Sequence, residues 1–175
     1  MKDAKLQANI WKLYLIQACR WFLLLMPVLN LFYEENGLSL DDLFIVQAFY
    51  SVCIIMSEIP SGYFADRLGR KNSMLIGAIL GSIGFFIYAD AHIFGQFLLA
   101  QFFLALSTSF ISGSDAALLY DTLLHLKRQD TYKKMAGRMA SVCSFSEGFA
   151  GLAGGLLALI SLRTPLYCQA SLMVI

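Results

Sequence analysis

Long apolar stretches separated by short charged connections constrain the fold of this chain more than any other feature. A helix needs about 20 residues to cross the hydrocarbon core of a bilayer. We expect spans near residues 12–33, 43–64, 72–89, 93–122 and 136–161, and the start of a sixth span at 165–175, where the sequence stops. The pattern predicts an all-α integral membrane protein, a single bundle over residues 1–175 with five complete helices and a truncated sixth.

The composition agrees with this fold class. Hydrophobic residues make up 58% of the 175 positions and charged residues only 14%, against about 25% charged residues in soluble domains. A net charge of +1 argues against a nucleic-acid partner. The two histidines stand apart from the four cysteines, and no nucleophile, metal-ligand or nucleotide-binding motif is present. We therefore expect no enzyme activity, no metal and no cofactor, and the lipid bilayer as a partner.

The basic residues indicate the orientation in the membrane. All but two of the 13 lysines and arginines lie before or at the start of the first span, between the second and third spans, or between the fourth and fifth spans and at the start of the fifth. The two exceptions are Arg20 and Arg163. Because cytoplasmic loops carry an excess of Lys and Arg, this bias predicts a multi-pass protein of the inner (plasma) membrane with a cytoplasmic N-terminus.

The connection after the second expected span carries the most specific pattern. It reads Gly62-Tyr-Phe-Ala-Asp66-Arg67-Leu-Gly69-Arg70-Lys71. A loop selected only for positive charge would need neither the aspartate nor the two glycines. Gly69 permits a turn that a residue with a Cβ would resist, and Gly62 would let two spans approach closely. The arginines are fork-shaped donors that can hold a carboxylate.

This connection resembles the signature loop of the major facilitator superfamily, G-x-x-x-D-R-x-G-R-[RK], at every specified position and at the same place between spans. The resemblance covers nearly the whole chain, as the first six-helix half of a twelve-span family. It implies a secondary active transporter that moves a small-molecule substrate by alternating access, here as a half-length chain whose partner is a missing C-terminal half or a second copy. The alternative is a non-transporting membrane scaffold or receptor-like helical bundle.

The resemblance also assigns roles in gating. In the family, the second arginine of the loop pairs with an acid on the fourth span, and the loop aspartate reaches the other half. These roles fall on Arg70, Asp121 and Asp66. The implied gating set comprises Gly62, Asp66, Arg67, Gly69, Arg70, Lys71 and Asp121.

Two further features concern the fifth and first spans. Gly154 and Gly155 match the end of the family's antiporter motif, G-P-x-x-G-G, but Ala150 and Gly151 stand where Gly-Pro would be. The alternative interpretation is a small-residue face for helix packing. Pro27 is expected to kink the first span.

Three charged residues fall near the centre of the membrane. At ~1.5 Å per residue, Arg20, Asp115 and Glu147 lie at similar depth, while Glu58 is nearer the cytoplasm. A central charge that faces lipid costs at least ~2.5–3.5 kcal/mol, so these residues should face inward, with Arg20 paired to Asp115 or Glu147. We hypothesise that Arg20 and Asp115 contact or gate substrate, and that an unpaired Glu147 could carry a coupling proton. Glu58 completes this candidate set, and a purely structural ion pair is the alternative.

Overall fold

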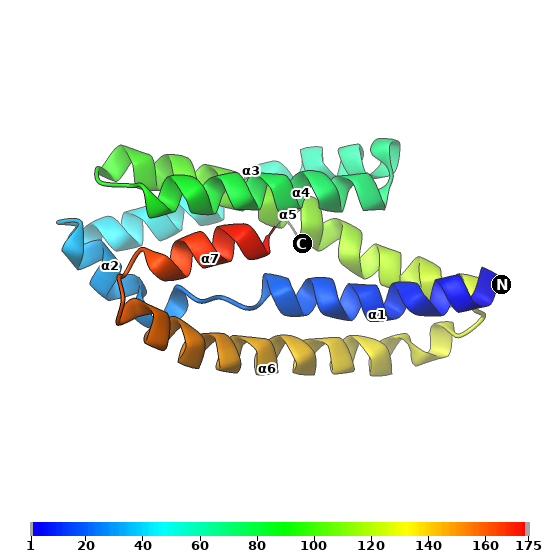
Figure 1. The fold of residues 1–175 in the computed structure, drawn as a ribbon. Helices are drawn as coiled ribbons and strands as arrows, with labels where there is room; N and C mark the ends of the chain where they lie inside the picture. Colours follow the sequence, from blue (N-terminus) through cyan, green and yellow to red (C-terminus); the bar gives the residue numbers. More distant parts are fainter. Residues whose placement is uncertain (1, 174–175) are drawn as a thin grey trace.

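The computed structural model describes residues 2–173, with side chains for residues 9–173, and this part of the chain is helical with no strand. The expected all-α fold is confirmed. The elements, shown in Figure 1, are α1 (Lys2–Arg20), η1 (Met26–Val28), α2 (Leu29–Glu35), α3 (Leu40–Leu68), α4 (Arg70–Ala89), α5 (Phe94–His125), η2 (Gln129–Thr131), α6 (Tyr132–Ala158) and α7 (Thr164–Leu172).

Within the described residues, four helical segments are long and apolar enough to cross a membrane: Leu40–Leu68, Arg70–Ala89, Phe94–His125 and Gln129–Ala158. The first expected span is different, because it is divided into α1 and α2 by a non-helical stretch at 21–25. The expected sixth span corresponds to α7, and its last two residues, 174 and 175, lie outside the described part.

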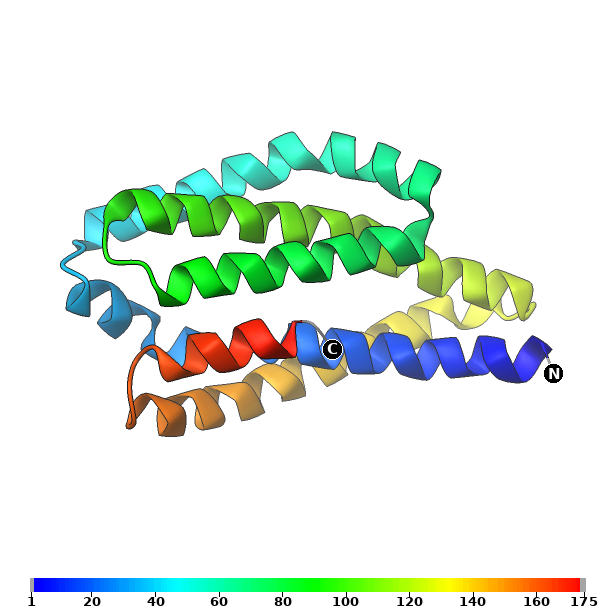
Figure 2. The same cartoon turned by 45° about the horizontal axis from the view of Figure 1, so that its top comes forward.

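The helices form two groups that α7 joins. Helices α3, α4 and α5 pack together, α6 runs beside α1, and α7 packs against α4 and α6 (Figures 1 and 2). Half of the apolar stretch of α4 (50%) is buried in the bundle, against 11% for α3 and for α6. Helix α4 is therefore an internal element, whereas α3 and α6 present most of their apolar surface outside this chain.

Two apolar clusters hold the ends of the bundle. At the end with the α4–α5 connection, aromatic rings stack and meet edge to face with centroids 5.3–6.1 Å apart. These rings belong to Phe32, Tyr33, Tyr88 and Phe97. The opposite end is held by Ile10, Leu13, Met74, Leu119 and Leu123. The clusters fix both ends of α1–α2 and α5, and the pair of Arg20 and Asp115 lies between them.

A single side chain ties together three connections at the aromatic end. The guanidinium of Arg163, between α6 and α7, donates to Asn36 Oδ1 (2.7 Å) after α2. It also donates to the carbonyl oxygens of Ala89, the last residue of α4, and of Ala91 (3.2 Å) in the connection that follows. It also lies over the Phe32 ring, 5.5 Å from its centroid. The sequence showed Arg163 only as an exception to the charge bias. Its partners, 72 to 127 residues away, could not be inferred from local spacing.

Candidate functional site

A buried polar cluster joins α1 to α5 in the middle of the bundle. Arg20 Nη1 lies 3.4 Å from Asp115 Oδ2, and the two side chains are only 17% and 10% exposed. Gln17, one turn before Arg20, donates its amide to the same carboxylate oxygen. The expected ion pair is therefore present with Asp115 as the partner. Gln17 was not singled out in the sequence, although its i, i+3 spacing from Arg20 places both side chains on one helix face.

The chain unwinds immediately after Arg20. We expected a kink at Pro27, but the helix already ends at Arg20, and Pro27 lies at the start of the short helix η1. Proline can begin a helix but clashes with the carbonyl one turn earlier, so the interruption lies before Pro27. The freed Leu24 N–H donates to Gln169 Oε1 of α7 at 3.1 Å. This contact supplies the internal partner that non-helical backbone needs at membrane depth.

Helix α6 packs directly on this unwound stretch. A Cβ added at Gly154 would overlap the Leu24 carbonyl group, whereas a Cβ at the neighbouring Gly155 would meet nothing within 4 Å. Ala150, one turn earlier, is fully buried. In this part of the chain, Ala150 and Gly154 form a small-residue packing face, and Gly155 lies outside it.

Glu147 does not join the central ion pair. Its side chain is exposed on α6 and makes no ion pair within residues 9–173. Its exposure concerns residues 9–173 alone, so the expectation that it faces inward in a whole transporter stays a prediction. Glu147 shares a helix face with Ser144 and Gly151, roughly opposite the exposed Phe145 and Phe149. It therefore lies on the small-residue side of α6.

The loop between α3 and α4 forms the second expected ion pair. Arg70 Nε lies 3.1 Å from Asp121 Oδ2 near the end of α5, with the side chains 33% and 42% exposed. Gly69 between the two helices has a φ of 83°, which confirms the turn that required a glycine. The pair thus joins the start of α4 to α5 at the surface of the bundle.

The remaining residues of the loop motif face outward or line a groove. Arg67 lies over the ring of Tyr63, 4.9 Å from its centroid, and Lys71 is exposed. Gly62 does not mediate close packing here, since an added Cβ would meet nothing within 4 Å. A polar groove of about 320 Å³ between α3 and α5 brings together Glu58, Asp66, Arg70 and several serines. Glu58 therefore groups with the loop and not with Arg20.

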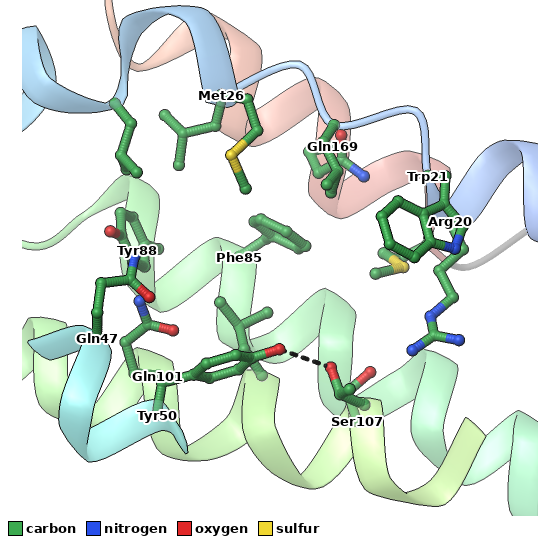
Figure 3. A pocket seen from close by; sticks show the side chains of 16 residues that line it. Arg20, Trp21, Met26, Gln47, Tyr50, Phe85, Tyr88, Gln101, Ser107 and Gln169 are labelled. Atoms are coloured by element: carbon green, nitrogen blue, oxygen red, sulfur yellow. Dashed lines mark hydrogen bonds between the residues drawn. The ribbon is translucent and has the colours of Figure 1, made fainter. Parts of the chain in front are cut away.

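A second cavity, of about 250 Å³, lies beside the unwound stretch and extends from Arg20 toward the aromatic end (Figure 3). Its walls come from the 21–25 stretch and from α3, α4, α5 and α7. Tyr50 of α3 and Thr108 of α5 hydrogen-bond at 2.9 Å on one side. The cavity thus connects the central ion pair to a wall of aromatic, amide and apolar side chains.

Comparison with known proteins relates this chain to a family and to individual curated proteins. The family model described as Major Facilitator Superfamily matches residues 11–175. Among curated proteins, the chain is similar to the Quinolone resistance protein NorA of Staphylococcus aureus strains MRSA252 and N315. Each is 26% identical over 149 residues, which are 85% of this chain and 37% of the relative. The chain therefore spans little more than a third of the length of these relatives.

Proposed function

The chain belongs to the major facilitator superfamily, and from this premise we propose that it forms one half of a secondary transporter that moves a small solute by alternating access. The other half would be a C-terminal bundle or a second copy. The observation that carries the proposal is the buried pair of Arg20 and Asp115, 3.4 Å apart, beside an interrupted helix. Interrupted helices near the midplane are typical of substrate sites in secondary transporters.

A scaffold would gain little from this arrangement. Removing two charges from water is costly, and apolar residues of similar volume often stabilise a bundle as well or better. Ionisable residues inside a membrane are therefore functional candidates. Arg20 and Asp115 would contact or gate the substrate.

The contact between Arg70 and Asp121 would act as a latch between access states. Partly exposed ion pairs contribute only about 0–1 kcal/mol, so this pair can form and break at small cost. Asp66 projects from the same loop without an ion-pair partner among residues 9–173, which fits a contact with the other half.

Glu147 would be the proton-coupling site. Its face of α6 carries small residues, opposite the bulky apolar side chains that suit lipid. In an assembled transporter it would therefore face protein or a water-filled path. Glu58, in the groove with Asp66 and Arg70, would respond to movement of the loop.

Transport in cells that express the natural gene tests these roles. The probe is a fluorescent quinolone, because the similar curated proteins are named quinolone resistance proteins. Its accumulation is measured at matched membrane expression. Arg20→Lys and Asp115→Asn should abolish the change in quinolone accumulation that the wild-type protein causes. Glu147→Gln should remove the pH dependence of that change. Arg70→Ala should change the rate several-fold without loss of folded protein. Wild-type rates and wild-type pH dependence in the first three variants would overturn the assignment.

We further propose that the N-terminus and the basic connections face the cytoplasm of a bacterial cell, because Lys and Arg concentrate there. Cysteines introduced at the exposed positions Glu35 and Gln129 lie in connections that this orientation places on opposite sides. An impermeant maleimide should label the Glu35→Cys protein in intact cells and the Gln129→Cys protein only after lysis. The unsubstituted chain, with its four native cysteines, is the control. The reverse pattern would overturn the orientation.

A further inference from the structure

The cavity beside the unwound stretch has an unbalanced charge. Among the described residues that line it, only Arg20 carries a formal charge and none is a carboxylate. Asp115 lies behind Arg20, where its Oδ2 accepts from Gln17 and Arg20 and its Oδ1 accepts from the Ala116 N–H at 2.5 Å. Both oxygens of the Asp115 carboxylate therefore already accept hydrogen bonds, and it is the positively charged Arg20 that faces the cavity.

Arg20 has donors left over. A guanidinium carries five N–H groups, and within the described residues Arg20 uses only Nη1, in one long contact of 3.4 Å. The side chain is 17% exposed, and in Figure 3 its head group reaches into the cavity from the end of α1. Its other N–H groups can donate to an anionic oxygen in the forked geometry that arginine favours.

A buried amide adds a second unused donor at the cavity wall. Gln169 is fully buried on α7, and its Oε1 is taken by the Leu24 N–H. This bond fixes the orientation of the amide and leaves Nε2 without a partner in the described part of the chain. An unsatisfied buried donor costs free energy, which an acceptor on a bound molecule would recover. Within the described residues, Arg20 and Gln169 Nε2 are thus two donors at this cavity that an acceptor could satisfy.

The rest of the wall is apolar and partly aromatic. In Figure 3 the Trp21 ring lies beside Arg20 and the Phe85 ring lies nearer the middle of the cavity, and Met26 and Leu104 add aliphatic surface. Flat rings stack favourably against such side chains. A volume of about 250 Å³ is just below the ~300–1,000 Å³ of sites for drug-sized ligands, so the occupant is small.

We propose that this cavity binds a small aromatic organic anion, with its carboxylate on Arg20 and beside Gln169 and its ring between Trp21 and Phe85. The inference rests on the proposed transport function for its biological meaning but concerns binding alone. A cation of the same shape would meet Arg20 without a compensating carboxylate. A neutral analogue would keep the ring contacts and lose the charge-assisted hydrogen bonds.

Three probes with one ring system separate these possibilities. The purified chain in lipid nanodiscs is titrated calorimetrically at neutral pH with 1-naphthoate, 1-naphthylmethanol and 1-naphthylmethylamine. We expect naphthoate to bind about tenfold more tightly than the alcohol, as charge-assisted bonds are about twice as strong as neutral ones. The amine should bind more weakly than the alcohol. An amine that binds as tightly as naphthoate, or an alcohol equal to it, would overturn the proposal.

Two variants assign the binding to this cavity. Arg20→Gln combined with Asp115→Asn removes both charges at similar volume, and the preference for naphthoate over the alcohol should disappear. Trp21→Ala, at an exposed position in the unwound stretch, should weaken all three probes several-fold and keep their order. If the double variant does not fold, Trp21→Ala still decides, because unchanged affinities would place the binding elsewhere.

Transport is measured separately, with radiolabelled naphthoate in proteoliposomes that contain the natural gene product. Naphthoate that binds with the expected preferences but is not transported would contradict the proposed function and leave this inference intact. Transport of another solute without naphthoate binding would do the opposite.

Discussion

Removing the Asp115 carboxylate should lower the stability of the bundle by about 3–5 kcal/mol. In an Asp115→Ala protein, the Arg20 guanidinium would remain between α1 and α5 without its acidic partner, and the Gln17 amide would lose its acceptor. Both side chains of the wild-type ion pair are largely buried, so water from the neighbouring cavity can replace the lost carboxylate only in part. Thermal unfolding followed by size-exclusion chromatography in detergent measures the loss.

The second ion pair supplies the matched control for this prediction. Asp121→Ala removes an acid from the same helix, but the Arg70–Asp121 pair is partly exposed, and its loss should cost only about 0–1 kcal/mol. A combined Arg20→Leu and Asp115→Leu protein should recover much of the stability, because an apolar pair avoids the uncompensated charge. It should still fail in transport. Equal stability losses for Asp115→Ala and Asp121→Ala would contradict the central role of the buried pair.

Replacing Gly154 by alanine should be nearly as damaging as removing Asp115. The added methyl group would overlap the Leu24 carbonyl group, which belongs to backbone and cannot rotate away like a side chain. Overpacking typically costs 1–3 kcal/mol, and here it would also displace the Leu24 N–H from Gln169. We expect a loss of about 3 kcal/mol and a lower yield of monodisperse protein.

Gly155→Ala is the control one residue away. Its Cβ would meet nothing within 4 Å, and alanine favours the helix by about 1 kcal/mol relative to glycine. This variant should therefore be as stable as the wild type or slightly more stable. Similar behaviour of the two alanine variants would show that α6 does not pack on the unwound stretch at Gly154.

The sequence predicted those features that depend on position along a helix. Span length and the glycine turn at Gly69 follow from residue counts and residue types. Depth and the cost of charge in lipid predicted that Arg20 pairs with Asp115 or Glu147, and the structure has Asp115 as the partner. The pairing of Arg70 with Asp121 followed from the family resemblance. Each of these predictions requires only the number of residues from a helix end, the type of residue, or a match to a known motif.

The features that the sequence did not predict depend on direction around a helix or on distant contacts. Glu147 lies on the small-residue side of α6, but its side chain is exposed and does not reach the Arg20–Asp115 pair. The bond between Leu24 and Gln169 joins residues 145 positions apart, and glutamine has no sequence pattern that marks such a role. Pro27 indicated an irregular first span, but the unwinding before it requires the partner that α7 provides.

The Arg163 contacts give the two ends of the bundle different mechanical stiffness. At one end a single guanidinium fastens the connections after α2, α4 and α6 to one another, above a packed aromatic cluster. At the other end, a smaller apolar cluster and one partly exposed ion pair join α4 to α5. Under an applied load, the first end would move as a rigid block, and the second would yield. A rocking motion of this bundle would therefore have its compliant end at the Arg70 loop.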